Sequence, residues 1–64
     1  MKATILELST YNENRLVLKI NGSAVVCHLA DMVQWDELYD ELMRPFDIHV
    51  LEVDDNGEYW ICLV

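Results

Sequence analysis

The hydrophobic side chains of residues 31–44 recur at the spacing of an amphipathic helix. With about 100° between successive residues they form a stripe roughly 120° wide, and the acidic residues of the segment lie on the opposite side. The stripe consists of Met32, Trp35, Leu38, Tyr39 and Leu42. Asp31 is a suitable N-cap, and Pro45 ends the helix because the residue before a proline avoids the α conformation. A helix of about 12 residues is unstable alone in water, so its hydrophobic side predicts a sheet beneath it.

Five further segments have the pattern of β-strands, with hydrophobic residues that alternate with polar ones or run continuously. They are residues 3–9, 15–20, 23–29, 47–54 and 58–64. The sequence therefore predicts an α+β fold, in which a single antiparallel-rich β-sheet of about five strands has one α-helix packed on one face, in the order β-β-β-α-β-β. We expect residues 1–64 to form a single small acidic domain.

Turn residues predict how the first three strands pair. Residues 11–14 form the first predicted turn. Asn21-Gly22 is typical of a two-residue type I′ turn, which places Leu18 opposite Val25. In the first hairpin, Leu6 and Leu8 should lie on the same sheet face as Leu16 and Leu18. This requires that the numbers of any two residues opposite one another add up to an even value, such as 24.

The last hairpin has two possible registers. A two-residue Asn56-Gly57 turn pairs Val53 with Trp60, whereas a three-residue loop pairs Val53 with Tyr59. The first gives the more hydrophobic pairs, and the second avoids placing two acidic residues opposite one another. We favour the first register.

Side chains between the sheet and the helix should form the core. The expected core residues are Leu6, Leu8, Leu16, Leu18, Val25, Trp35, Leu38, Leu42 and Leu51. A single helix leaves the other sheet face uncovered, and we expect Ile5, Val17, Val26 and some of Val50, Ile61 and Leu63 there. A second copy of the chain could cover that face, which makes a homodimer a candidate assembly.

The charge is uneven and narrows the range of partners. The net charge is −8, and residues 30–64 hold ten of the twelve acidic residues but only one of the four basic residues. Nucleic acids and anionic membranes bind clustered Lys and Arg, so we expect direct binding to neither. A basic protein surface is the partner that such a field attracts.

The sequence also predicts a cytoplasmic protein. No hydrophobic run approaches the roughly 20 residues of a membrane span, and Glu7 interrupts the N-terminal segment before a signal peptide could form. In a reducing compartment Cys27 and Cys62 are expected to be small core residues without a disulfide.

Catalytic, cofactor and metal sites are not expected. Cys27, His28, His49 and Cys62 are zinc-ligand types, but no C-x2-C or H-x3-H pair occurs. Residues 54–58 have the composition of a calcium loop without its alternating ligands, and we expect an ordinary turn. The chain has no Gly-rich phosphate loop and no activated nucleophile, so it is not expected to be an enzyme.

Two acidic groups are the candidate partner-binding residues. The first, on the predicted helix, consists of Asp36, Glu37, Asp40 and Glu41; the second, on the last hairpin, consists of Glu52, Asp54, Asp55 and Glu58. Trp60 joins the second group as an interface anchor if the register exposes it. Carboxylates about 6 Å apart on adjacent helical turns approach the spacing of backbone phosphates, so the helix face can imitate a nucleic-acid strand. The competing interpretation is a merely solvated acidic face.

In size and charge, the chain is similar to the small acidic inhibitors that phages encode, such as anti-restriction and anti-CRISPR proteins, which occupy basic nucleic-acid channels. The similarity implies a function and carries over no site residues. We therefore predict a small acidic interaction or inhibitor protein that binds a basic, nucleic-acid-binding protein surface by nucleic-acid mimicry. The alternative is a small homo-oligomeric or accessory subunit whose interface is the uncovered sheet face.

Overall fold

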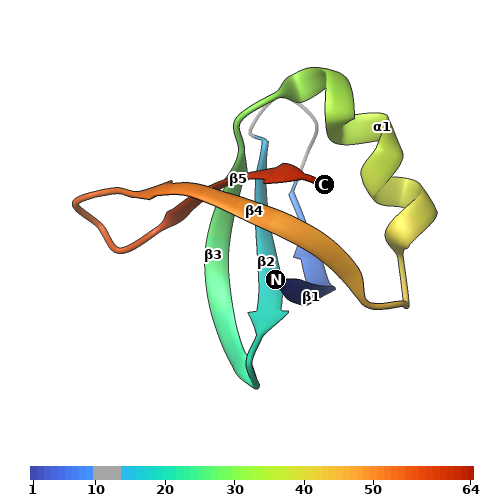
Figure 1. The fold of residues 1–64 in the computed structure, drawn as a ribbon, viewed down its shortest axis with the longest axis horizontal. Helices are drawn as coiled ribbons and strands as arrows, with labels where there is room; N and C mark the ends of the chain where they lie inside the picture. Colours follow the sequence, from blue (N-terminus) through green and yellow to red (C-terminus); the bar gives the residue numbers. More distant parts are fainter. Residues whose placement is uncertain (10–13) are drawn as a thin grey trace.

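The chain forms a closed five-stranded β-barrel, drawn in Figure 1 from a computed structural model that describes residues 1–9 and 14–64. The strands are β1 (Lys2–Leu8), β2 (Arg15–Ile20), β3 (Ser23–Leu29), β4 (Phe46–Val53) and β5 (Tyr59–Leu63). Three consecutive helical turns, η2 (Met32–Gln34), α1 (Trp35–Leu38) and η3 (Tyr39–Glu41), join β3 to β4. We call residues 32–41 the helical segment. The turn expected at residues 11–14 lies, apart from Asn14, outside the described residues.

The strands follow the order β1-β2-β3-β5-β4 around the barrel. β4 closes the barrel beside β1, where Lys2 is opposite Asp47 and Ala3 is opposite Phe46. β3 and β5 are parallel, whereas the other neighbouring strands are antiparallel. Because β4 returns by a long connection to lie beside β1, the first four strands form a Greek key. The architecture is therefore a five-stranded Greek-key barrel.

The predicted α+β fold, an open sheet with a helix packed on one face, is wrong: the fold is mostly β, with one short helical segment. Hydrophobic alternation predicts one buried sheet face, and it is equally compatible with a sheet that curls until it closes on that face. Two β-bulges favour the curl, because an extra residue bends a strand and increases its twist. One bulge lies between Ile5 and Glu7 of β1, and the other between Val50 and Glu52 of β4.

The hairpin between β2 and β3 has the predicted turn and register. Asn21 and Gly22 have φ angles of 51° and 85°, as a type I′ turn requires. Leu18 is opposite Val25, as expected. Near the turn of the first hairpin, Leu8 is opposite Leu16, so the numbers of opposed residues have the predicted even sum. Further along β1 the sum changes, because the bulge adds one residue to that strand.

The register that we favoured for the last hairpin is wrong, and the alternative register occurs instead. Val53 is opposite Tyr59. The carboxylate of Asp54 accepts hydrogen bonds from the backbone N–H groups of Asn56 (2.9 Å) and Glu58 (3.0 Å). Because these two bonds satisfy backbone donors within the turn, they stabilise the three-residue loop over the shorter one.

The helical segment is shorter than the helix predicted over residues 31–44. Asp31 is its N-cap, as expected, and accepts a hydrogen bond from the Val33 N–H (3.0 Å). The segment ends at Glu41, since Leu42 is extended with a ψ of 137°. The chain therefore leaves the helix before reaching the proline that was expected to end it. Among the described residues, no helix is long and apolar enough to span a membrane.

The expected core is partly confirmed. Fully buried, as expected, are Leu16, Leu18, Trp35 and Leu38. Leu8 and Val25 are half-buried against them. Leu6, Leu42 and Leu51 were wrongly assigned to the core, since they are 54%, 42% and 52% exposed. Leu6 and Leu51 lie at the two bulges, and Leu42 follows the end of the helical segment. The rest of the core consists of Ala3, Ile20, Cys27, Leu29, Phe46, Ile48 and Ile61.

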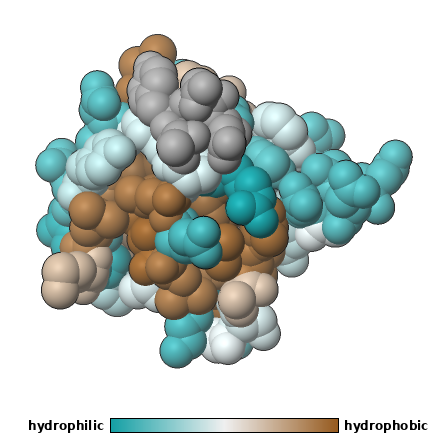
Figure 2. All heavy atoms as spheres, turned by 180° about the vertical axis from the view of Figure 1, so that it is seen from behind, coloured by the Kyte–Doolittle hydropathy of each residue, from teal (hydrophilic) through white to brown (hydrophobic). Residues whose placement is uncertain are grey.

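The closed barrel leaves no open sheet face of the kind expected. Val17 and Val26, opposite one another on β2 and β3, are half-buried. Of the other residues expected on that face, Ile61 is fully buried, and Ile5, Val50 and Leu63 pack against the core. Hydrophobic side chains nevertheless gather on the rear face, where the second half of β1 lies (Figure 2). Leu6, at the β1 bulge, is the exposed leucine of that strand.

Candidate functional site

The helical segment presents carboxylates that have no cationic partner among the described residues. Asp36, Glu37 and Asp40 are exposed, and none of them takes part in a salt bridge. Glu41 differs, because its Oε2 lies 2.9 Å from the Arg44 Nε. Like charges one helical turn apart repel, so this arrangement costs folding free energy, a few tenths of a kcal/mol per pair.

Exposed hydrophobic residues flank these carboxylates. Val33 is 83% exposed and Met43 is 99% exposed. Tyr39 and Leu42, which the helical periodicity placed in the core, are also exposed. The prediction for Tyr39 and Leu42 fails because the segment has too little regular α-helix, so one stripe does not stay turned towards the barrel.

The second acidic group lies at the other end of the molecule. Figure 1 places the turn between β4 and β5 and the helical segment at opposite ends of the long axis. Glu52 and Asp55 are exposed there, whereas Asp54 and Glu58 are half-buried. The two groups predicted from the sequence are therefore two separate surfaces.

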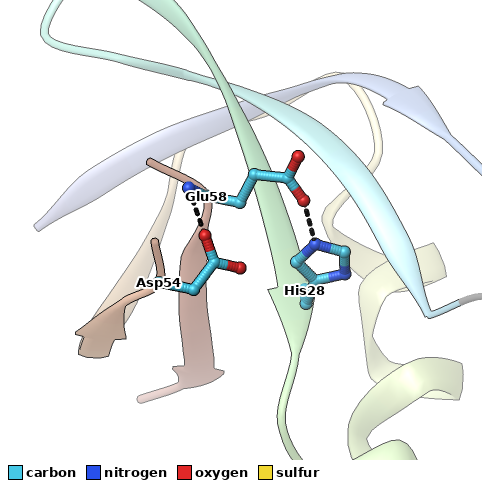
Figure 3. Close-up of side chains that lie close together, drawn as sticks. All are labelled: His28, Asp54 and Glu58. Atoms are coloured by element: carbon cyan, nitrogen blue, oxygen red, sulfur yellow. Dashed lines mark hydrogen bonds and ion pairs between the residues drawn. The ribbon is translucent and has the colours of Figure 1, made fainter. Parts of the chain in front are cut away.

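A cluster of polar and aromatic side chains connects β3 to the last hairpin (Figure 3). His28 is opposite Trp60 in the parallel β3–β5 pair, and their rings stack with centroids 4.8 Å apart and planes inclined by 21°. The His28 Nε2 lies 2.5 Å from the Glu58 Oε1. We call His28, Asp54, Glu58 and Trp60 the hairpin cluster.

Asp54 is the best anchored member of the hairpin cluster. Its Oδ2 accepts a hydrogen bond from the Trp60 indole N–H (3.2 Å), while its Oδ1 accepts the two backbone bonds of the turn. The backbone N–H of Glu58 is the main cause that lowers the pKa of the Asp54 carboxyl below its usual value. Partial burial acts in the opposite direction, and the donors from Trp60 and Asn56 lower the pKa further. Trp60 is therefore half-buried and held by Asp54 rather than projecting freely.

The donor atoms of His28, Asp54 and Glu58 all lie within 4.8 Å of one another. Sequence reasoning missed this group because it compared Cys and His spacings with zinc motifs, and none of these three residues forms such a motif with the others. Only the parallel pairing of β3 with β5 brings residue 28 beside residues 54–58. No local sequence signal predicts that pairing.

The two cysteines are free thiols, as expected, and differ in burial. Cys27 lies in the core, as expected, and burial raises the pKa of its thiol to about 11. Cys62 is only half-buried and lies opposite His49 on β4. Cys27 points into the barrel and the neighbouring His28 does not, so these two residues cannot share a metal ion.

The basic residues of the barrel do not offset the helical acids. Lys2, Lys19 and Pro45 are among the residues that line a surface depression of about 270 Å³. The Lys2 ammonium binds Asp47 at 3.0 Å. Among the described residues, Arg44 alone forms a salt bridge with an acid of the helical segment.

Comparison of this chain with protein-family models, with curated proteins and with solved structures found no match.

Proposed function

We propose that this protein is a small acidic inhibitor that docks on a basic protein surface through the carboxylates of its helical segment. The observation that carries the proposal is the coexistence of two features on one short segment. Among the described residues, Asp36, Glu37 and Asp40 are exposed and have no cationic partner, and Val33 and Met43, which precede and follow them in the chain, expose hydrophobic side chains. Interfaces combine such hydrophobic contacts with a polar rim.

The charge pattern supports a basic partner. Self-repelling carboxylates destabilise the free protein slightly, and a cationic surface would remove that repulsion on binding. In an α-helix, side chains one turn apart are about 6 Å apart, which is close to the spacing of nucleic-acid phosphates. We therefore propose a nucleic-acid-binding protein as the partner, with the helical segment occupying its basic channel in the cytoplasm, as phage-encoded inhibitors of similar size and charge do.

The proposed docking surface contains fewer residues than the two acidic groups that were singled out from the sequence. Asp54, Glu58 and Trp60 bind other residues of the chain, and the hairpin lies at the opposite end of the molecule. One partner surface would have to extend past the whole barrel to contact both ends. The alternative function, a homo-oligomeric or accessory subunit, relied on an open sheet face, and barrel closure removes that support.

The test uses the whole chain as bait in a lysate of its native host. The capture is performed at about 50 mM and at about 500 mM salt, below and above the physiological ionic strength. Captured proteins are identified by mass spectrometry, and their affinity is then measured with purified components. We expect nucleic-acid-binding proteins to be captured at low salt, to bind more weakly at high salt and to be released by competing duplex DNA.

A matched pair of charge reversals decides between the two ends of the molecule. Asp36→Lys with Asp40→Lys should abolish binding, whereas Glu52→Lys with Asp55→Lys should leave it nearly unchanged. Both pairs reverse two exposed carboxylates, so a general charge effect would weaken binding equally. Unchanged binding after the helical reversal, or direct binding of the wild-type chain to DNA, would contradict the proposal. Thermal melts of both variants confirm that each is folded.

A further inference from the structure

We propose that His28, Asp54 and Glu58 form a binding site for a divalent transition-metal ion such as Zn²⁺. One imidazole nitrogen and two carboxylate oxygens are ligands that first-row divalent metals bind. The three donor atoms already lie within 4.8 Å of one another, and all three side chains are half-buried. The site is separate from the helical segment that we propose as the docking surface.

The distances between the donor atoms suit a metal ion with small movements of the side chains. Bonds of about 2.0–2.1 Å in a tetrahedral zinc site separate ligand atoms by about 3.3 Å. The His28 Nε2 and the Glu58 Oε1 are 2.5 Å apart and would move apart slightly. Asp54 would move closer to His28 and Glu58, whose side chains face one another in Figure 3. Small rotations about the side-chain bonds of Glu58 and Asp54 would provide both movements without a change in the backbone.

Trp60 orients two of the three ligands. Its indole ring stacks on the His28 ring, and its N–H donates to the Asp54 Oδ2. Residues that orient ligands from behind in this way raise metal affinity, because the ligands need less ordering on binding. The Asp54 carboxylate is also held by the backbone N–H groups of the turn. The ligands therefore come from two stiff elements, the β3 strand and the β4–β5 turn.

The electrostatic surroundings favour a cation. Asp54 and Glu58 supply two negative charges, and Glu52 adds another beside them, because it lies opposite Trp60 on β4. Arg15, opposite His28 on β2, is the cation nearest to the site along the strand pairing. The side chains of His28 and Glu58 are 16% and 31% exposed. A metal ion held by three residues there would keep a position open to solvent water.

The experiment titrates the purified chain with Zn²⁺ by calorimetry in metal-free buffer, and repeats the titration with Mg²⁺. We expect one Zn²⁺ per chain and no measurable Mg²⁺ binding, because Mg²⁺ prefers oxygen ligands in an octahedral arrangement. His28→Gln and Glu58→Gln should each weaken Zn²⁺ binding by at least about tenfold. Asp54→Asn tests the third ligand in the same way, and circular dichroism shows whether each variant is folded.

Two control variants make the outcome specific. Asp55→Asn removes the same charge as Asp54→Asn from the next residue of the turn, and it should leave the affinity for Zn²⁺ within about twofold. Cys62→Ser removes the thiol opposite His49, a second pair of residues of zinc-ligand type, and it should also leave the affinity unchanged. The proposal is overturned if wild type binds no Zn²⁺, if Cys62→Ser abolishes binding, or if Asp55→Asn weakens it as much as Glu58→Gln does.

Discussion

Leu38 and Leu42 provide a direct test of how the helical segment packs. Both lie on the hydrophobic stripe of the sequence, yet Leu38 is fully buried and Leu42 is 42% exposed. A regular helix lying on a sheet would bury the two leucines about equally. The structure instead predicts that Leu38→Ala and Leu42→Ala have very different costs.

The expected magnitudes follow from burial. Truncating a buried leucine removes its transfer free energy and leaves a cavity, which together cost about 2–5 kcal/mol. Leu42 loses only part of a transfer free energy of about 1.5–3 kcal/mol, and solvent fills the space, so we expect about 1 kcal/mol. At about 0.05–0.15 kcal/mol per residue, a chain of 64 residues has a stability of about 3–10 kcal/mol. Leu38→Ala therefore removes a large part of it.

Urea unfolding followed by tryptophan fluorescence measures both costs. With a slope of about 1 kcal/mol/M for so small a protein, the midpoint should fall by about 2–5 M for Leu38→Ala and by about 1 M for Leu42→Ala. Equal shifts for the two variants would mean that Leu42 is buried, and they would refute this account of the segment.

Two further predictions concern the titratable groups. Because the pKa of Asp54 is lowered in the folded chain, its contribution to stability is complete above the usual value of 3.8 and is lost as the pH falls through the lowered value. Asp54→Asn should therefore melt at a lower temperature than wild type at pH 7, and the difference should shrink on acidification to pH 2; a constant difference would contradict this. At neutral pH, iodoacetamide should modify Cys62 in the folded chain and Cys27 only after urea unfolding, since Cys27 is buried and burial raises the pKa of its thiol to about 11. Equal modification of both thiols without urea, measured by peptide mass spectrometry, would contradict the burial of Cys27.

Local signals in the sequence predicted the β2–β3 hairpin and the helix N-cap, although not the register of the last hairpin. The β2–β3 hairpin follows from Asn21-Gly22, because a type I′ turn fixes both the loop length and the register. The N-cap at Asp31 is local in the same sense. Barrel closure pairs Lys2 with Asp47, which are far apart in the sequence, and no periodicity in either strand reports that contact. The open sheet was therefore the simpler prediction and the wrong one.

In the candidate site, too, local features could be predicted from the sequence, whereas contacts between distant segments could not. Helical periodicity correctly predicted that Asp36, Glu37 and Asp40 are exposed, although it failed for Tyr39 and Leu42 of the same segment. The separation of the two acidic groups depends on how the barrel closes, so it could not be read from the sequence. The contact of His28 with Glu58 depends on the parallel β3–β5 pairing and on the loop of the last hairpin, for which we favoured the wrong register.

The bulge in β1 has a consequence for aggregation. β4 pairs with β1 only at Lys2 and Ala3, so the second half of β1 has an edge without a neighbouring strand in the described part of the chain. Regular, unpaired strand edges recruit strands from other molecules and begin intermolecular sheets. The bulge at Leu6 interrupts the hydrogen-bonding register along this edge, so that an incoming strand cannot pair continuously with it. The irregularity that exposes a leucine also keeps this edge of the barrel from serving as a template.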